Sequence, residues 1–259
     1  MDERVELAGV LYERAIFGIA DGPAQPGWQG GLTGADRKLN ALVQTDREPD
    51  ALARAERGPD ALARAERGLD ALARADRELD AAEAELVLAR GKVMHGLFLE
   101  DRVENPAELP SFERAGSLYK KLGDERGEAE ALFWIGCFHQ VVRGDNATAK
   151  PVLVQSRDLA TKTGDKLTLS YALRHLGVAE QVAGHLDAAR ELLEASTSLR
   201  RELGFMPGVA ANLVGLIYIA SAQNRTADAE ALADEAAALA EACRAGKIFD
   251  QVTAARARL

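Results

Sequence analysis

Glycine and alanine recur along the C-terminal part of this chain with an almost constant spacing. The glycines are Gly123, Gly164, Gly204 and Gly246, which lie 41, 40 and 42 residues apart. Alanine keeps the same period within the intervening segments, at Ala149, Ala189 and Ala229. A period of about 40 residues is typical of stacked helical hairpins, because one hairpin cannot bury its apolar face alone. The spacing therefore predicts a repeat array.

Apolar residues within each unit recur at helical spacing, which predicts two helices per unit. The expected pairs cover residues 127–142 with 146–162, 167–183 with 188–203, and 208–223 with 226–243. An earlier pair is expected over 80–100 and 108–121, and a capping helix over 246–259 with Ile248, Val252 and Ala255 on its apolar side. Aromatic residues make up only 5% of the chain, and alanine and leucine dominate the apolar set, as in closely packed helices. We expect an all-α protein, an α-solenoid of antiparallel helix pairs over residues 80–245.

Residues 1–79 do not share this period and are expected to form an irregular helical segment. A helix is predicted over 3–19, and glycine and proline exclude regular structure over 21–34. Residues 49–58 and 59–68 are identical, and 69–78 is a third, imperfect copy, which indicates tandem duplication, with a functional motif as the alternative. Each ten-residue copy turns its leucine by roughly 80° around a helix axis, so the leucines do not form one stripe. Gly58-Pro59 should interrupt the chain and leave short helices.

The charge and composition exclude several classes of function. A formal net charge of −9 argues against a nucleic-acid partner, because phosphate binding depends on clustered lysine and arginine. No stretch approaches the roughly 18 apolar residues of a membrane helix, so we expect no membrane partner and a cytoplasmic protein. No glycine-rich phosphate loop is present, and no cofactor is implied. The two cysteines, Cys137 and Cys243, are expected to be reduced thiols.

Cysteine and histidine are the residues that could carry chemistry. Cys137 and His139 with His175 could form a thiol nucleophile and its base, or a metal site completed by His95. Residues two apart on a helix point about 200° away from one another, so Cys137 and His139 cannot address one site. We therefore expect no catalytic residues, no metal ligands and no enzymatic activity.

A short pattern recurs within the repeats. It runs Leu173-x-x-Leu176-Gly177 with Gly184, Ala189 and Leu193, then Leu132-x-x-Ile135-Gly136 with Gly144, Ala149 and Leu153, and more loosely Leu213-x-x-Leu216 with Asn224 and Ala229. On these residues the chain resembles long-period tetratricopeptide repeat proteins, such as the arrays at the C-terminal end of large bacterial transcriptional activators. It departs from them where Ile217 replaces the first-helix glycine.

The resemblance implies a right-handed superhelix whose first helices line a concave groove. It also implies a non-enzymatic adaptor that binds a partner peptide or helix in that groove. The inward positions are Glu130, Phe133, Trp134, Cys137, Gln140, Tyr171, Arg174, His175, Val178, Gln181, Val214, Tyr218 and Ser221.

Two other functions remain open at this point. The same face could bind an anionic or aromatic small molecule between Tyr171, Arg174 and His175, as a sensor or a catalyst. The chain could also be a self-assembling structural element that pairs with a second copy through an exposed edge, as a homodimer.

Overall fold

The structure is a computed structural model that describes residues 59–259. The described residues fall into two units, one from Leu79 to Leu259 and one that contains the residues up to Glu78. All regular elements in this range are helical. They are α3 (Pro59–Asp101), α4 (Glu108–Leu122), α5 (Glu125–Cys137), the π-helical turn η2 (Phe138–Val142), α6 (Asn146–Thr163), α7 (Lys166–Val182), α8 (Leu186–Glu202), α9 (Met206–Ala222), α10 (Thr226–Ala242) and α11 (Gly246–Arg256).

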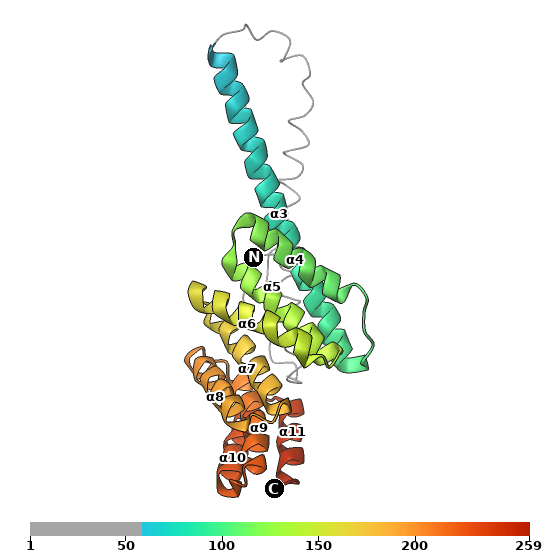
Figure 1. The fold of residues 1–259 in the computed structure, drawn as a ribbon, viewed down its shortest axis with the longest axis vertical. Helices are drawn as coiled ribbons and strands as arrows, with labels where there is room; N and C mark the ends of the chain where they lie inside the picture. The colour runs from blue at the N-terminus through green and yellow to red at the C-terminus, as the bar shows by residue number, and fades with distance from the viewer. Residues whose placement is uncertain (1–58) are drawn as a thin grey trace. The chain divides into compact units, whose positions relative to one another are not determined.

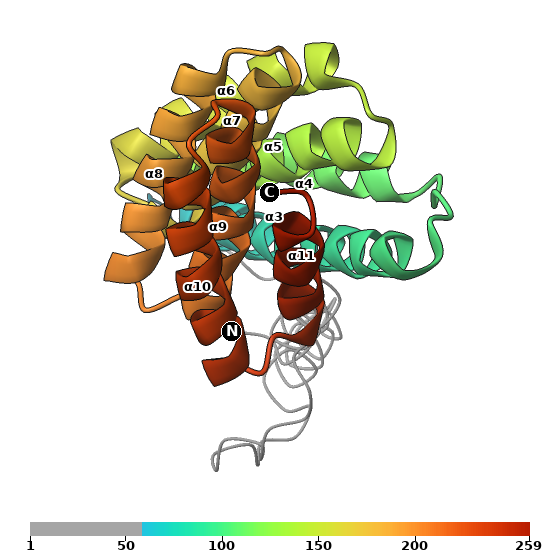
Figure 2. The same ribbon diagram turned by 90° about the horizontal axis from the view of Figure 1, so that it is seen from below.

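The helices from α5 to α10 form three antiparallel pairs, each packed on the next (Figure 1). This confirms the all-helical array of hairpins that the spacing predicts. The first helices of successive pairs also contact one another, α5 with α7 and α7 with α9. Figure 2 shows these three helices toward the inside of the arrangement, with α6 and α8 toward the outside. We call the surface formed by α5, α7 and α9 the inner face.

The first described helix differs from the expectation. Short, interrupted helices were expected through the ten-residue copies, but from Pro59 onward the chain is one helix that continues to Asp101. Proline suits the first turn of a helix, and the Ala, Leu, Arg and Glu of these copies favour helix strongly enough to offset Gly68. Rotation of the leucines is no obstacle because Leu69 and Leu72 remain exposed. The expected helix 3–19, the loop 21–34 and the copy at 49–58 lie outside the described residues.

The periodic glycines end helices. Gly123, Gly164 and Gly204 have φ angles of 73°, 70° and 69°, in the left-handed region that glycine adopts without strain. Gly246 is different, because it is the first residue of α11 and Arg244, with φ 54°, takes the left-handed position. The periodic glycines therefore lie at helix ends at three of the four positions and at a helix start at the last.

A close contact between the two helices of each pair depends on a small residue. The equivalent positions on the first and second helix are Gly136 with Leu153, Gly177 with Leu193, and Ile217 with Ala233. A Cβ atom on Gly136 would lie 2.6 Å from Leu153 Cγ, and one on Gly177 would lie 3.1 Å from Leu193 Cγ. In the third pair the large and small residues are exchanged, and both are completely buried. The departure at Ile217 is thus matched by a compensating alanine.

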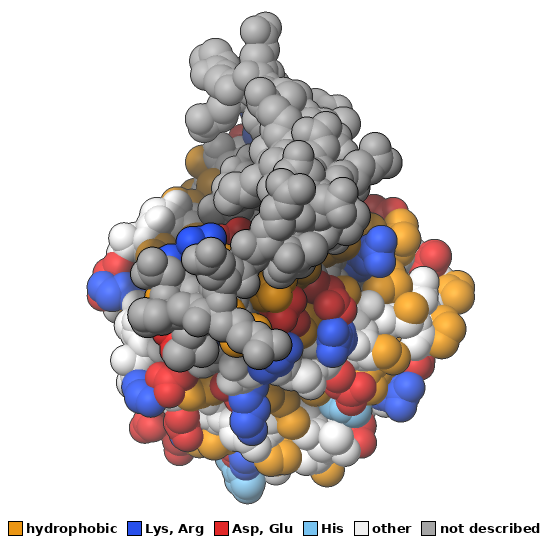
Figure 3. All heavy atoms as spheres, turned by 90° about the horizontal axis from the view of Figure 1, so that it is seen from above, with side chains coloured by type: hydrophobic (Ala, Val, Ile, Leu, Met, Phe, Trp, Pro, Cys, Tyr) orange, Lys and Arg blue, Asp and Glu red, His pale blue; other side chains and the backbone are white. Residues whose placement is uncertain are grey.

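On the face seen in Figure 3, charged side chains of both signs are interspersed. Several join neighbouring helix pairs, among them Lys150 with Glu180 and Arg201 with Glu235. Within the part of the chain that the structure describes, no helix has the length and apolar character needed to cross a bilayer.

Candidate functional site

The clearest break in the repeating core is an arginine on α8. Each second helix buries the same four-residue stripe, which in α8 consists of Ala189, Leu193, Ser196 and Arg200. The slot of Arg200 holds Ala160 in α6 and Ala240 in α10, and all three residues are at most 1% exposed. A charged side chain therefore occupies a position that alanine fills in the other repeats, which is costly unless the charge is held by polar groups.

A second polar residue replaces alanine beside it. Asn212 on α9 stands where the earlier first helices carry Ala131 and Ala172, and all three are completely buried. The Arg200 Nη1 donates to Asn212 Oδ1 at 3.0 Å and to the carbonyl oxygen of Gly208 at 2.8 Å. Two exceptions to the repeat are therefore in direct contact with each other.

The network extends to α7. The Arg174 Nη1 donates to the same Asn212 Oδ1 at 2.9 Å and to the Ala211 carbonyl oxygen at 2.9 Å. Asn212 Nδ2 donates to Ser196 Oγ at 2.8 Å, and Ser196 Oγ donates to the Ser170 carbonyl oxygen at 2.6 Å. We call Ser170, Arg174, Ser196, Arg200 and Asn212 the polar cluster. It brings two guanidinium groups to one acceptor at the inner face.

Aromatic rings flank the polar cluster. Phe133 of α5 and Tyr171 of α7 are stacked with centroids 5.2 Å apart, and Tyr171 lies 6.0 Å from Phe205. The Arg200 guanidinium is 4.9 Å from the centroid of Tyr171 and 5.4 Å from that of Phe205. These distances are typical of cation–π contacts, which stabilise an arginine that has left water.

His175 connects the cluster to the π-helical turn. Its Nδ1 lies 2.6 Å from Gln140 Oε1, and Gln140 Nε2 donates to the His175 carbonyl oxygen at 3.0 Å. Burial, followed by the positive charges of Arg174, Arg200 and His95, holds the pKa of His175 well below its usual value. The ring is therefore neutral in the folded protein at neutral pH.

This neutral histidine should make the protein acid-labile. The unfolded chain takes up a proton on His175 below its usual pKa of about 6.5, whereas the folded chain does not. The contribution of His175 to the free energy of unfolding is therefore fully present above pH 6.5. It falls by up to about 1.4 kcal/mol for each pH unit below that value. The free energy of unfolding in urea, measured for the wild type between pH 5 and 7, should show this slope. In His175→Gln the slope should be smaller by the amount that corresponds to one bound proton. Equal slopes in the two proteins would contradict the assignment.

The structure divides the predicted groove residues into two groups. Five are buried and belong to the core, so a partner could not reach them here: Phe133, Trp134, Cys137, Gln140 and Val214. Tight packing between helices explains this, since Trp134 stacks on Phe112 and Phe133 on Tyr171. The other eight are partly exposed: Glu130, Tyr171, Arg174, His175, Val178, Gln181, Tyr218 and Ser221.

Contacts of the partly exposed residues differ. Glu130 forms an ion pair with Lys92 of α3, and Arg258 lies 5.8 Å from the ring centroid of Tyr218. Arg174 is tied to α9, so reversing its charge would disturb helix packing together with any binding.

Cys137 faces His95 and not His139, whose ring packs against Phe138. No group of three or more possible ligands within the described range could hold a metal ion.

Sequence reasoning missed Arg200, Asn212 and Phe205. A signal was present, because alignment of the repeats places Arg200 in the slot of Ala160 and Ala240. Leu199-Arg-Arg-Glu looks like a charged surface segment when it is considered alone, and the exception becomes visible only against the neighbouring repeats.

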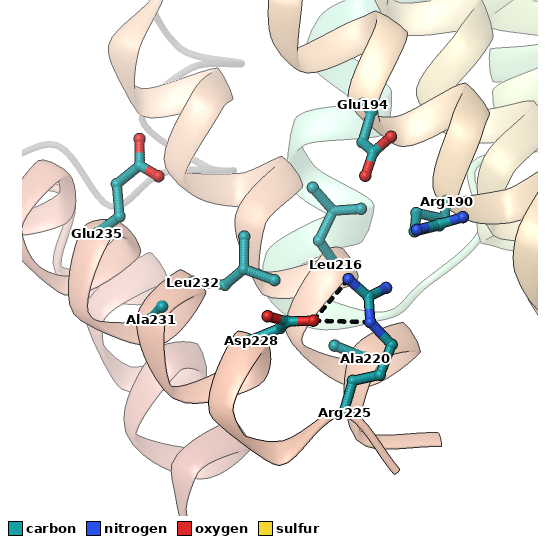
Figure 4. Close-up of a pocket in the computed structure, with 9 residues that line it drawn as sticks. All are labelled: Arg190, Glu194, Leu216, Ala220, Arg225, Asp228, Ala231, Leu232 and Glu235. Atoms are coloured by element: carbon teal, nitrogen blue, oxygen red, sulfur yellow. Dashed lines mark hydrogen bonds and ion pairs between the residues drawn. The ribbon is translucent and has the colours of Figure 1, made fainter. Parts of the chain in front are cut away.

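A cavity of about 300 Å³ lies elsewhere, between α8, α9 and α10. Figure 4 shows Leu216 and Leu232 between the acidic side chains of Glu194 and Asp228, with Arg225 paired to Asp228 at 2.7 Å. Another cavity of about 550 Å³ is lined by α3 residues such as Leu86 and Val93, together with Ala107, which precedes α4, and Ser111 of α4. Neither is lined by the Tyr171, Arg174 and His175 set that the small-molecule hypothesis requires.

Fold and site define the class of protein as an all-helical array of antiparallel helix pairs with a polar cluster beneath its inner face. The sequence matches no protein-family model and no curated protein.

Proposed function

We propose that the array is a non-enzymatic adaptor of the tetratricopeptide type, a right-handed superhelix that binds a partner segment on its inner face. The observation that supports this is the polar cluster, in which Arg200 and Asn212 replace alanines of the repeating core. Departures from a repeat that cost stability are typical of functional positions.

The chemistry of the cluster indicates the partner. Arg174 is partly exposed and offers a positive charge that a partner can reach, whereas Arg200 is buried behind it, between the rings of Tyr171 and Phe205. Guanidinium groups bind carboxylates, and aromatic rings bind apolar side chains. The expected partner segment is therefore an amphipathic helix or peptide that carries a carboxylate, and its affinity should fall as salt is added.

Photo-crosslinking in the native cells tests this function with matched positions. Val178 and Gln181 are partly exposed on α7, whereas Ser198 is exposed on the second helix of the same pair. A benzophenone amino acid at Val178 or Gln181 should capture one common protein, and at Ser198 it should not. Arg174→Gln, which removes the charge but retains a donor, should lower capture from Val178 by about tenfold or more.

Equal capture from Ser198, or capture that Arg174→Gln does not change in a protein with wild-type thermal stability, would contradict the adaptor function. A rise in melting temperature with a small anionic compound, together with no captured protein, would favour the small-molecule alternative.

Self-association is a second candidate because of an apolar stripe on α3. Within the Leu79–Leu259 unit, Leu79 and Leu97 are about half exposed, and Leu79, Leu86 and Val93 follow a seven-residue spacing. Such a spacing is typical of paired helices. Light scattering should then show a mass that rises with concentration and returns to the monomer in Leu79→Glu/Leu97→Glu. A mass independent of concentration would exclude this function.

A further inference from the structure

The structure brings together a thiol, an imidazole and a carboxylate that are far apart in the sequence. Cys137 Sγ of α5 lies 3.6 Å from His95 Nε2 of α3, and His95 Nδ1 lies 2.7 Å from Glu108 Oε1 at the start of α4. All three side chains are at most 1% exposed. A nucleophile beside a base that a third group orients is the arrangement found at activated cysteines.

The protonation of this group follows from its contacts. Burial alone disfavours a charged ring, but negative charge on Cys137 and the hydrogen bonds with Cys137 and Glu108 together raise the pKa of His95 to about 10. A doubly protonated ring donates from both nitrogens, to Glu108 on one side and to the sulfur on the other.

Other charged groups around the thiol do not oppose this arrangement. Lys92 of α3 is paired with Glu130 and lies 5.8 Å from the Trp134 ring centroid. His175 of α7 is neutral, as shown above. On the side of the His95 ring away from the sulfur, the Glu108 Oε2 atom is buried and accepts no hydrogen bond from the residues described. A buried acceptor of this kind can receive a hydrogen bond from a small O–H donor.

We propose that Cys137 is a peroxide-reactive thiolate, activated by His95 and oriented through Glu108. The sulfur attacks one oxygen of hydrogen peroxide, the O–O bond breaks, and the leaving hydroxide takes the proton from His95 Nε2. The products are a cysteine sulfenic acid, water and neutral His95, with sulfur oxidised by the two electrons that reduce the peroxide. Burial excludes bulky oxidants, so the site selects molecules close to water in size.

Cys243 is an internal reference for this reaction. It is more exposed than Cys137, and burial raises the pKa of its thiol, which keeps it protonated at neutral pH. An ordinary thiol is only a few per cent ionised at pH 7, so a full thiolate should react at least about tenfold faster. Access alone predicts the opposite order, with Cys243 first.

The test exposes the reduced full chain to hydrogen peroxide and follows oxygen addition at each cysteine by peptide mass spectrometry. Cys137 should gain oxygen at least about tenfold faster than Cys243, and His95→Gln should abolish this advantage. Far-ultraviolet absorbance of the thiolate at pH 7 gives a second readout in variants that retain His95. The absorbance of Cys243→Ser should exceed that of Cys137→Ser/Cys243→Ser by the contribution of one thiolate. Oxidation of Cys243 first, or no difference in absorbance, would overturn the proposal.

Discussion

Replacing Ile217 with glycine should destabilise the array by about 3–6 kcal/mol, because it empties a fully buried position and adds a glycine to a helix interior. Replacing Ala233 with leucine should cost about 1–3 kcal/mol through overpacking against Ile217. The double variant Ile217→Gly/Ala233→Leu recreates the glycine–leucine pair of the other two hairpins. It should therefore be more stable than the sum of the single changes by about 0.5–3 kcal/mol.

Chemical denaturation followed by circular dichroism gives the three free energies of unfolding. The matched control is Ala231→Leu with Ile217→Gly, since Ala231 is exposed on the same helix. That pair should show additive effects. If Ala233→Leu and Ile217→Gly are also additive, the two side chains do not compensate each other and the size exchange has no energetic meaning.

Replacing Arg200 with alanine should cost at least about 3 kcal/mol. The change removes the donor to the Gly208 carbonyl and one donor to Asn212, and it leaves a void between Tyr171 and Phe205. Arg200→Met keeps most of the volume and should recover part of the loss. Thermal unfolding of the purified variants measures both effects.

The adjacent arginine is the control for this prediction. Arg201 pairs with Glu235 across the surface, and both side chains are about half exposed. Exposed ion pairs contribute little, so Arg201→Ala should cost no more than about 1 kcal/mol. Similar losses for Arg200→Ala and Arg201→Ala would mean that the buried contacts of Arg200 contribute nothing to stability.

The helix pairs could be predicted from the sequence because their signals are local. Apolar spacing, glycine at helix ends and small residues at close contacts recur in each hairpin, so each repeat supports the interpretation of the others. The continuous helix from Pro59 was not predicted, since a Gly-Pro step indicates both an interruption and a helix start. The π-helical turn after Cys137 leaves no pattern in the sequence that we recognised.

The candidate site was harder to predict because its contacts join distant residues. Helix identity alone places Arg174 and Tyr171 on the inner face, but the contact of Arg200 with Asn212 depends on how α8 packs against α9. Likewise, 42 residues separate Cys137 from His95. The spacing of Cys137 and His139 on one helix excludes a site shared by those two residues, but it does not predict that α3 brings His95 to Cys137. Five inward positions proved to be core because neighbouring first helices approach closely enough to enclose them.

The left-handed glycines have a consequence for how such a chain changes length. A Cβ atom at Gly123, Gly164 or Gly204 would meet nothing within 4 Å, so these residues are constrained by backbone geometry and not by neighbours. The junctions at Gly123 and Gly164 are therefore positions at which a complete hairpin can be inserted or removed, whereas across Gly204 the contact of Arg200 with Asn212 ties α8 to α9. A chain that is longer or shorter by one whole hairpin at these two junctions is therefore expected to keep the backbone geometry of the remaining array.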